Sequence, residues 1–139
     1  MDYKHYKADA ARKRQLTYMI TKELESCKGV EFAYLFGSFT GDSPVFRDID
    51  LGVYYQENDH LETFDMALSL AVQLTKKTTI PVDVRVLNDA PVTFLYKVIK
   101  GELIFEKNKN LRCKLMENTI REYLDIKPIL YRAMKEAYS

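Results

Sequence analysis

The spacing of apolar residues predicts two amphipathic helices in the first half of the chain. Residues 8–27 carry apolar side chains at intervals of three and four positions, and Gly29 stands where such a helix would end. The same spacing follows a polar turn at 56–60. The predicted apolar face of this second helix contains Leu61, Phe64, Leu68, Ala71 and Val72.

Four shorter segments have the pattern of β-strands. An aromatic and apolar run at 31–36 is typical of a buried strand. Residues 48–55 and 82–86 alternate between apolar and polar positions, so each predicts a strand with two different faces. A further short strand is predicted at 103–105.

The last third of the chain is predominantly helical in pattern. A short helix is predicted near Pro91, with Asn88 or Asp89 as its cap. Residues 110–138 form a longer helical pattern that Pro128 must interrupt or kink, because proline lacks an amide hydrogen. The predicted order is α-β-β-α-β-α-β-α-α. It describes an α/β (α+β) fold, with a small mixed sheet flanked by helices and with C-terminal helices.

Length and charge narrow the class of protein. The 139 residues suit a single domain, 1–139, with a core at about 8–106 and a helical segment at about 108–138. A net charge of +1 gives no strong nucleic-acid signal and no membrane signal. No secretory or spanning segment is present, so we expect a cytoplasmic protein in which Cys27 and Cys113 are reduced thiols.

Three carboxylates and a Gly-Ser pair form the candidate site. A period of two places Asp48 and Asp50 on one strand face, where their repulsion calls for a compensating cation such as Mg²⁺. Asp83, on the polar face of a later strand, is the candidate third carboxylate of a site for two metal ions. Gly37 and Ser38 follow a strand, where a glycine lets phosphate approach the backbone.

These residues lie in a pattern that resembles a known superfamily. The runs Leu-Phe-Gly-Ser-Phe at 35–39 and Asp-Ile-Asp-Leu at 48–51, with Val-Asp-Val at 82–84, resemble the signature of DNA polymerase β-type nucleotidyltransferases. More narrowly, the chain resembles the minimal nucleotidyltransferases (MNT) that act as antitoxins of HEPN-domain ribonuclease toxins in prokaryotic toxin–antitoxin systems. The similarity extends over about 8–115.

The resemblance implies an activity and a role for each matched residue. ATP would bind with two Mg²⁺ ions, and AMP would pass to a hydroxyl, in the antitoxin branch to a tyrosine of the cognate HEPN toxin. Gly37 and Ser38 match the phosphate-binding pair. Asp48 and Asp50 match the metal-binding pair, and Asp83 matches the third carboxylate, which binds metal and helps to deprotonate the acceptor. Pairing with a toxin implies a hetero-oligomer, and self-association stays open.

The sequence also departs from the family pattern. The loop at 39–47 is one residue short and lacks the arginine that is common there. Arg47 replaces a common serine and is a candidate for a displaced positive charge on the triphosphate. Two alternatives therefore stay open. One is an inactive module that neutralises its partner by binding. The other is an aminoglycoside-type enzyme, which usually carries an additional helical domain; only residues 84–139 follow the third carboxylate, and this argues against a full second domain.

Three further interpretations stay open from the sequence. Arg85 shares the face of Asp83, where an ion pair is preferred to phosphate binding. The aromatic C-terminal segment, 123–138, is equally suited to cover a sheet edge or to bind a partner. The basic cluster is either a solvated helix start or a contact for nucleotide or toxin, and it consists of Lys107, Lys109, Arg112 and Lys114.

Overall fold

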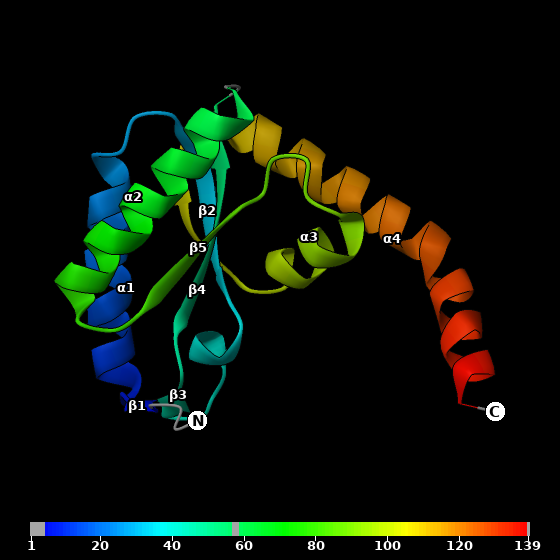
Figure 1. The fold of residues 1–139 in the computed structure, drawn as a ribbon, viewed down its shortest axis with the longest axis horizontal. Helices are drawn as coiled ribbons and strands as arrows, with labels where there is room; N and C mark the ends of the chain where they lie inside the picture. The colour runs from blue at the N-terminus through cyan, green and yellow to red at the C-terminus, as the bar shows by residue number, and fades with distance from the viewer. Residues whose placement is uncertain (1–4, 57–58, 139) are drawn as a thin grey trace.

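The computed structural model describes residues 5–56 and 59–138, and it has a small sheet with helices on both faces (Figure 1). This confirms the predicted fold class. In chain order the elements are β1 (Tyr6–Lys7), α1 (Ala10–Glu25), β2 (Val30–Phe36), the 3₁₀ turn η1 (Ser38–Thr40), β3 (Val45–Phe46), β4 (Ile49–Tyr55), α2 (His60–Thr78), β5 (Val82–Val86), α3 (Val92–Ile99), β6 (Glu102–Glu106) and α4 (Lys109–Ala137).

The main sheet has the strand order β5-β4-β2-β6. β2 is antiparallel to both of its neighbours, and β4 is parallel to β5. The end of β2 and the starts of β4 and β5 therefore meet at one end of the sheet. There Phe36 lies opposite Asp50, and Asp50 lies opposite Asp83. The pairing of the strands therefore places residues that are far apart in sequence side by side at this end of the sheet.

One face of the sheet is covered by α1 and α2. The apolar stripe predicted for α1 is confirmed, since Leu16, Ile20 and Leu24 have no exposed surface. They pack against the side of β4 that carries Ile49 and Leu51. The opposite face is covered by α3 and the start of α4, and its buried core consists of Phe32, Tyr34, Phe36, Leu87, Leu95 and Val98.

The apolar face predicted for α2 is wrong. Four of its members are mostly exposed: Leu61 (73%), Phe64 (58%), Leu68 (51%) and Val72 (54%). The helix instead buries Thr63, Ala67, Leu70, Leu74 and Thr78. A helix can bury threonine when its hydroxyl bonds to a backbone carbonyl four residues earlier. Thr63 does so to Asp59 at 3.1 Å and Thr78 to Leu74 at 2.8 Å. The turn predicted before this helix lies partly outside the described residues.

The cap predicted for α3 is also wrong. Pro91 occupies the N-cap position, and no side chain caps the helix there. Asn88 is used elsewhere, because its amide accepts from the backbone nitrogen of Tyr55 at 2.9 Å and donates to the carbonyl of Tyr55 at 2.8 Å. The side chain of Asn88 therefore extends the hydrogen bonding of β4 beyond the end of β5.

The long C-terminal pattern forms one helix and not the predicted two, with Pro128 inside α4. The helix bends along its length, and its second half projects away from the sheet (Figure 1). Proline leaves one carbonyl without its helical partner, and water satisfies such a group on an exposed helix. Tyr131 and Tyr138 are 70% and 88% exposed, so this half does not cover the sheet edge.

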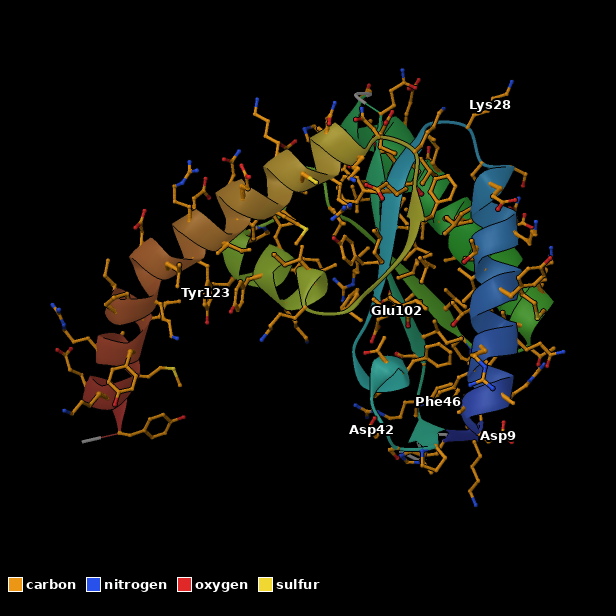
Figure 2. The ribbon with its side chains drawn as sticks, turned by 180° about the vertical axis from the view of Figure 1, so that it is seen from behind. Asp9, Lys28, Asp42, Phe46, Glu102 and Tyr123 are labelled. Carbon is orange, nitrogen blue, oxygen red and sulfur yellow. The ribbon has the colours of Figure 1, made fainter. Side chains whose placement is uncertain are left out.

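The first half of α4 is held by specific contacts. Tyr123 stacks on Tyr96 of α3 with ring centroids 3.7 Å apart, and Figure 2 shows it on the side of α4 that faces α3. Arg112, from the predicted basic cluster, donates to Glu106 at 2.9 Å and to the hydroxyl of Tyr34 at 3.4 Å. This arginine therefore joins α4 to β6 and β2, so the interpretation as a merely solvated charge is wrong for it.

Two further expectations concern the thiols and the membrane. Both cysteines, Cys27 and Cys113, are free. Among the described residues, no helix combines the length and the apolar character that crossing a bilayer requires.

The contacts of Asn88 generate the first prediction. Asn88→Ala removes both hydrogen bonds to Tyr55 and is expected to lower the free energy of unfolding by about 1–3 kcal/mol. Asn118→Ala, an exposed position on α4, is the matched control and should change it by less than about 0.5 kcal/mol. Urea denaturation measures both values. Equal stability of the two variants would contradict the bridging role of Asn88.

Candidate active site

The three predicted carboxylates meet at one end of the sheet. Asp48 directly precedes β4, Asp50 is the second residue of β4, and Asp83 is the second residue of β5. Asp50 and Asp83 are partners in the parallel register. Asp50 lies on the side of β4 that faces α3, because its neighbours Ile49 and Leu51 are buried on the other side, toward α1 and α2. Asp48 and Asp50 are half-buried, whereas Asp83 is exposed.

Gly37 brings the backbone against this cluster. It has φ of 79° and ψ of −158°, a conformation that side chains with a Cβ rarely adopt. A Cβ at this position would collide with the carboxylate oxygen Oδ2 of Asp50. Ser38 begins the 3₁₀ turn that follows, and Thr40 closes it by donating its hydroxyl to the carbonyl of Gly37 at 2.8 Å. Gly37 and Ser38 are exposed, so a ligand can reach both.

The electrostatics of Asp50 reflect its neighbours. The pKa of Asp50 is raised from 3.8 to about 6. Burial is the largest cause, followed by the negative charges of Asp48 and then Asp83. The positive charges of Lys97 and Arg85 oppose the shift. Like charges that oppose ionisation in this way are stabilised by a cation placed between them. The cluster therefore has unbalanced negative charge at the end of the sheet.

Two positive side chains lie beside the carboxylates. Arg85 donates to Asp83 at 3.0 Å, which confirms the ion pair that the sequence favoured. Lys97, on α3, acts on the charge of Asp50 and was missed by sequence reasoning. Its only sequence signal is its position on a short helix that buries Leu95 and Val98. Its neighbourhood depends on how α3 packs on the sheet, which a linear pattern does not contain.

The carboxylates supply hard oxygen donors of the kind that Mg²⁺ prefers. Among the described residues, no three acidic, histidine or cysteine side chains lie close enough together to hold one metal ion. Asp83 is held by Arg85 instead. The donor set still fits a divalent cation, because Asp48 and Asp50 lie on either side of Ile49 at the start of β4, and Asp83 is the register partner of Asp50. Asp83 would complete the set once it exchanges Arg85 for a metal.

The short loop at 39–47 is firmly held despite its unusual length. Phe39 and Phe46 are buried and meet edge to face, with centroids 4.9 Å apart. Lys13 of α1 donates to the carbonyls of Gly41 at 3.0 Å and Ser43 at 2.7 Å. β3 within the loop pairs with β1, and Figure 2 shows Phe46 close to the start of α1. Arg47 is exposed at the end of this loop, directly before Asp48.

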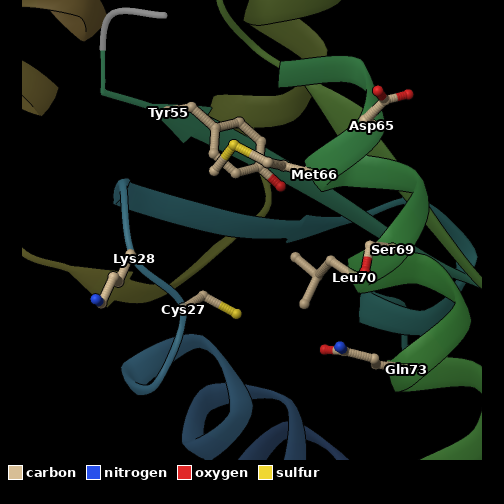
Figure 3. Close-up of a pocket in the computed structure, with 8 residues that line it drawn as sticks. All are labelled: Cys27, Lys28, Tyr55, Asp65, Met66, Ser69, Leu70 and Gln73. Carbon is tan, nitrogen blue, oxygen red and sulfur yellow. The ribbon is translucent and has the colours of Figure 1, made fainter. Parts of the chain in front are cut away.

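A separate hollow of about 360 Å³ lies at the opposite end of β4, between the end of α1 and the middle of α2 (Figure 3). Tyr55 lines it, and burial raises the pKa of its hydroxyl above the usual range. Among the described residues, this hydroxyl is the one buried side-chain polar atom without a hydrogen-bond partner. None of the six predicted site residues lines this hollow, so it is distinct from the candidate site.

Gly37 generates the second prediction. Gly37→Ala is expected to cost about 1–3 kcal/mol of unfolding free energy, because alanine resists the positive φ and its methyl group displaces Asp50. Gly41→Ala is the matched control, because Gly41 has φ of −77° and a Cβ there would lie 3.4 Å from the carbonyl oxygen of Ser38. It should change stability by less than about 1 kcal/mol. Equal losses in urea denaturation would refute the proposed collision.

The raised pKa of Asp50 generates the third prediction. A raised carboxyl pKa favours the protonated folded form, so its contribution to stability is full below pH 3.8 and is lost as the pH rises through about 6. In EDTA, Asp50→Asn should therefore melt at a higher temperature than the wild type above pH 6, and this advantage should shrink toward pH 4. Asp125→Asn, exposed on α4, is the control and should follow the wild type. Melting curves that stay parallel over this pH range would contradict the raised pKa.

Comparisons with known proteins bear on this fold. A chain from a re-refined structure of the tri-AMPylated Shewanella oneidensis HEPN toxin in complex with MNT antitoxin is similar at a TM-score of 0.68 and 18% identity, covering 91% of this chain and 99% of that chain. A chain from the toxin–antitoxin complex MntA–HepT has a TM-score of 0.65 at 18% identity, covering 91% and 99%. One from a toxin–antitoxin structure with AMP-PNP has 0.63 at 17%, covering 90% and 98%.

These likenesses confirm, at the level of the fold, the resemblance to MNT antitoxins that the sequence motifs indicated. A search of curated proteins finds no match. The family model for polymerase beta nucleotidyltransferases matches residues 19–110, which include all the predicted site residues. The match covers well over half of the sequence, and the chain therefore belongs to the polymerase beta nucleotidyltransferase family.

Proposed function

We propose that this protein transfers AMP from ATP to a tyrosine hydroxyl of a cognate HEPN toxin and so acts as its antitoxin. The observation that carries the proposal is the convergence of Asp48, Asp50 and Asp83 beside Gly37 at one end of the sheet. The same fold occurs in the structure of a tri-AMPylated HEPN toxin with its MNT antitoxin, which supports the toxin as acceptor.

Two Mg²⁺ ions are the cofactors that this site calls for. Asp48 and Asp50 would hold them, with Asp83 as the third carboxylate, and the ions would supply charge neutralisation at the triphosphate and at the attacking oxygen. The raised pKa of Asp50 supports this role, because a cation between the carboxylates would relieve their repulsion. Gly37 and Ser38 would bind phosphate oxygens through their backbone amides and the Ser38 hydroxyl.

The reaction is an in-line displacement at the α-phosphorus of ATP. The acceptor hydroxyl oxygen forms the new bond to phosphorus, its proton passes to the carboxylate of Asp83, and the bond to pyrophosphate breaks. The exposure of Asp83 supports this role, because an incoming hydroxyl can reach it from solvent. Arg47, directly before Asp48, and Lys97, which acts on the charge of Asp50, are the positive side chains that we assign to the triphosphate.

A second candidate function is neutralisation by binding alone. The ion pair between Arg85 and Asp83 favours it, since it occupies the third carboxylate in the absence of metal. This candidate predicts tight association with the toxin and no transfer of AMP. An aminoglycoside-type activity has no such supporting observation.

The fourth prediction separates these candidates. The purified protein is mixed with its cognate HEPN toxin, ATP and Mg²⁺, and intact-mass spectrometry records AMP added to the toxin. The double variant Asp48→Asn, Asp50→Asn should lose transfer by at least about 100-fold, because carboxylates that neutralise the transferring group are removed. Asp125→Asn is the control and should transfer as the wild type does.

Each result of this experiment has a clear meaning. Transfer by the wild type that the double variant loses supports the proposed enzyme. Transfer that the double variant retains contradicts the role of the carboxylates. Tight binding without any transfer by the wild type contradicts the proposed activity and favours neutralisation by binding.

A further inference from the structure

A groove of about 510 Å³ runs beside the outer edge of β5 and contains Asp83. Its walls come from three directions, namely the exposed side of α2, both faces of β5, and the segment that leads into α3. The residues that matter for its chemistry are Phe64, Leu68, Asp83, Val84, Pro91 and Phe94. The groove is therefore mostly apolar, and its charged lining residues are the candidate catalytic carboxylate Asp83 and its ion-pair partner Arg85.

The edge of β5 offers unpaired backbone groups to this groove. β5 is the terminal strand of the sheet, and no strand of the described residues pairs with its outer side. Ile49 donates to the carbonyl of Pro81 and Leu87 donates to the carbonyl of Val53, each at 2.9 Å, so odd-numbered residues of this segment face β4. By alternation, Val84 and Val86 direct their amide and carbonyl groups outward.

The neighbouring position along this edge is already covered. The amide of Val82 donates to the side-chain hydroxyl of Thr75 on α2 at 3.0 Å. Val84 and Val86 have no such contact from α2, and both remain partly exposed. An exposed strand edge of this kind is a template for pairing with another extended chain.

The exposed stripe of α2 supplies an apolar wall. Phe64 and Leu68 are each more than half exposed and line the groove, although the helix has an adequate buried face without them. Single exposed apolar residues are common on proteins, but apolar residues that gather along a groove indicate a binding surface. Their presence accounts for part of the exposed apolar stripe that sequence periodicity took for the buried face of α2.

The groove has the length of a short extended segment. A second hollow of about 400 Å³ shares Phe64 and Val86 with it and continues to His60 and Asp89. Together the two hollows follow β5 from Asp83 to Val86, about 10 Å at the rise of an extended chain, and then the turn that contains Asp89.

From these observations we infer that an extended segment of the acceptor protein docks as an added strand beside β5 and presents its acceptor side chain to Asp83. The inference rests on the proposed function and specifies how its substrate binds. The added strand pairs with Val84 and Val86. Its alternating side chains point to opposite faces, so the acceptor tyrosine lies on the side of Asp83 and Phe94. The residues next to it lie against Phe64 and Leu68 and are apolar.

The test measures binding and transfer separately. Affinity of the HEPN toxin for this protein is measured by calorimetry without ATP, and KM and kcat for the toxin are measured from AMP transfer. The double variant Phe64→Ser, Leu68→Ser should weaken affinity and raise KM by at least tenfold, with kcat within twofold. Leu61→Ser is the matched control, because Leu61 is exposed on the same helix and does not line the groove. Thermal melting of each variant confirms that it is folded.

Synthetic peptides test the strand pairing directly. The modified tyrosine is located by mass spectrometry, and peptides around it are made with single N-methyl groups at successive positions. N-methylation removes a backbone donor, so it should weaken binding by at least tenfold at every second position and little at the positions between. A loss that is uniform or absent along the peptide overturns the added strand.

The remaining outcomes are also decisive. Unchanged affinity and KM in the Phe64 and Leu68 double variant overturn the inference while leaving the proposed function intact. A change of this chain's own oligomeric state with unchanged toxin affinity assigns the groove to a second copy and also overturns it. Absence of transfer by the wild type, together with weakened toxin binding by the double variant, contradicts the proposed function but supports the docking site.

Discussion

The close approach of Gly37 to Asp50 is the constraint on which the candidate site depends. The turn after β2 passes so near the start of β4 that no side chain fits between the backbone and the carboxylate. This approach is possible because β2 and β4 are adjacent and antiparallel, so that the end of one meets the beginning of the other. The turn proposed to bind phosphate and the carboxylate proposed to bind metal are thereby held in one place by the sheet itself.

The packing of the sheet offsets the repulsion among these carboxylates. Two buried layers, one under α1 and α2 and one under α3, fix the strands that carry Asp50 and Asp83. Burial, and then the charges of Asp48 and Asp83 that these strands hold close, raise the pKa of Asp50. Arg85 and Lys97 partly offset the charge, and a divalent cation would complete the balance. The unusual short loop is held by Lys13 and by paired aromatic rings, so its length does not loosen the site.

The edge of the sheet has a different character from its centre. The side of β5 away from β4 meets an exposed apolar wall on α2, and the same strand carries Asp83. A transfer enzyme with a protein acceptor needs a surface of this type next to its chemistry, because the hydroxyl must be held in line with the phosphorus. The projecting half of α4 is a second exposed apolar element, remote from the carboxylates in the fold (Figure 1).

The sequence by itself determined the four strands of the main sheet, the first helix and the grouping of the candidate site residues, but it did not predict the two-residue strands β1 and β3. Alternation in 48–55 placed Asp48 and Asp50 on one face, and the motif spacing indicated the family, because both depend on local geometry and residue type. Only the tertiary structure decided which stripe of α2 is buried, how α3 is capped, and that α4 continues through Pro128. It also revealed Lys97 near Asp50 and the groove along β5. These features depend on which surfaces pack together. The spacing of apolar residues predicts a helix or a strand, but it does not specify which other element will cover its apolar face.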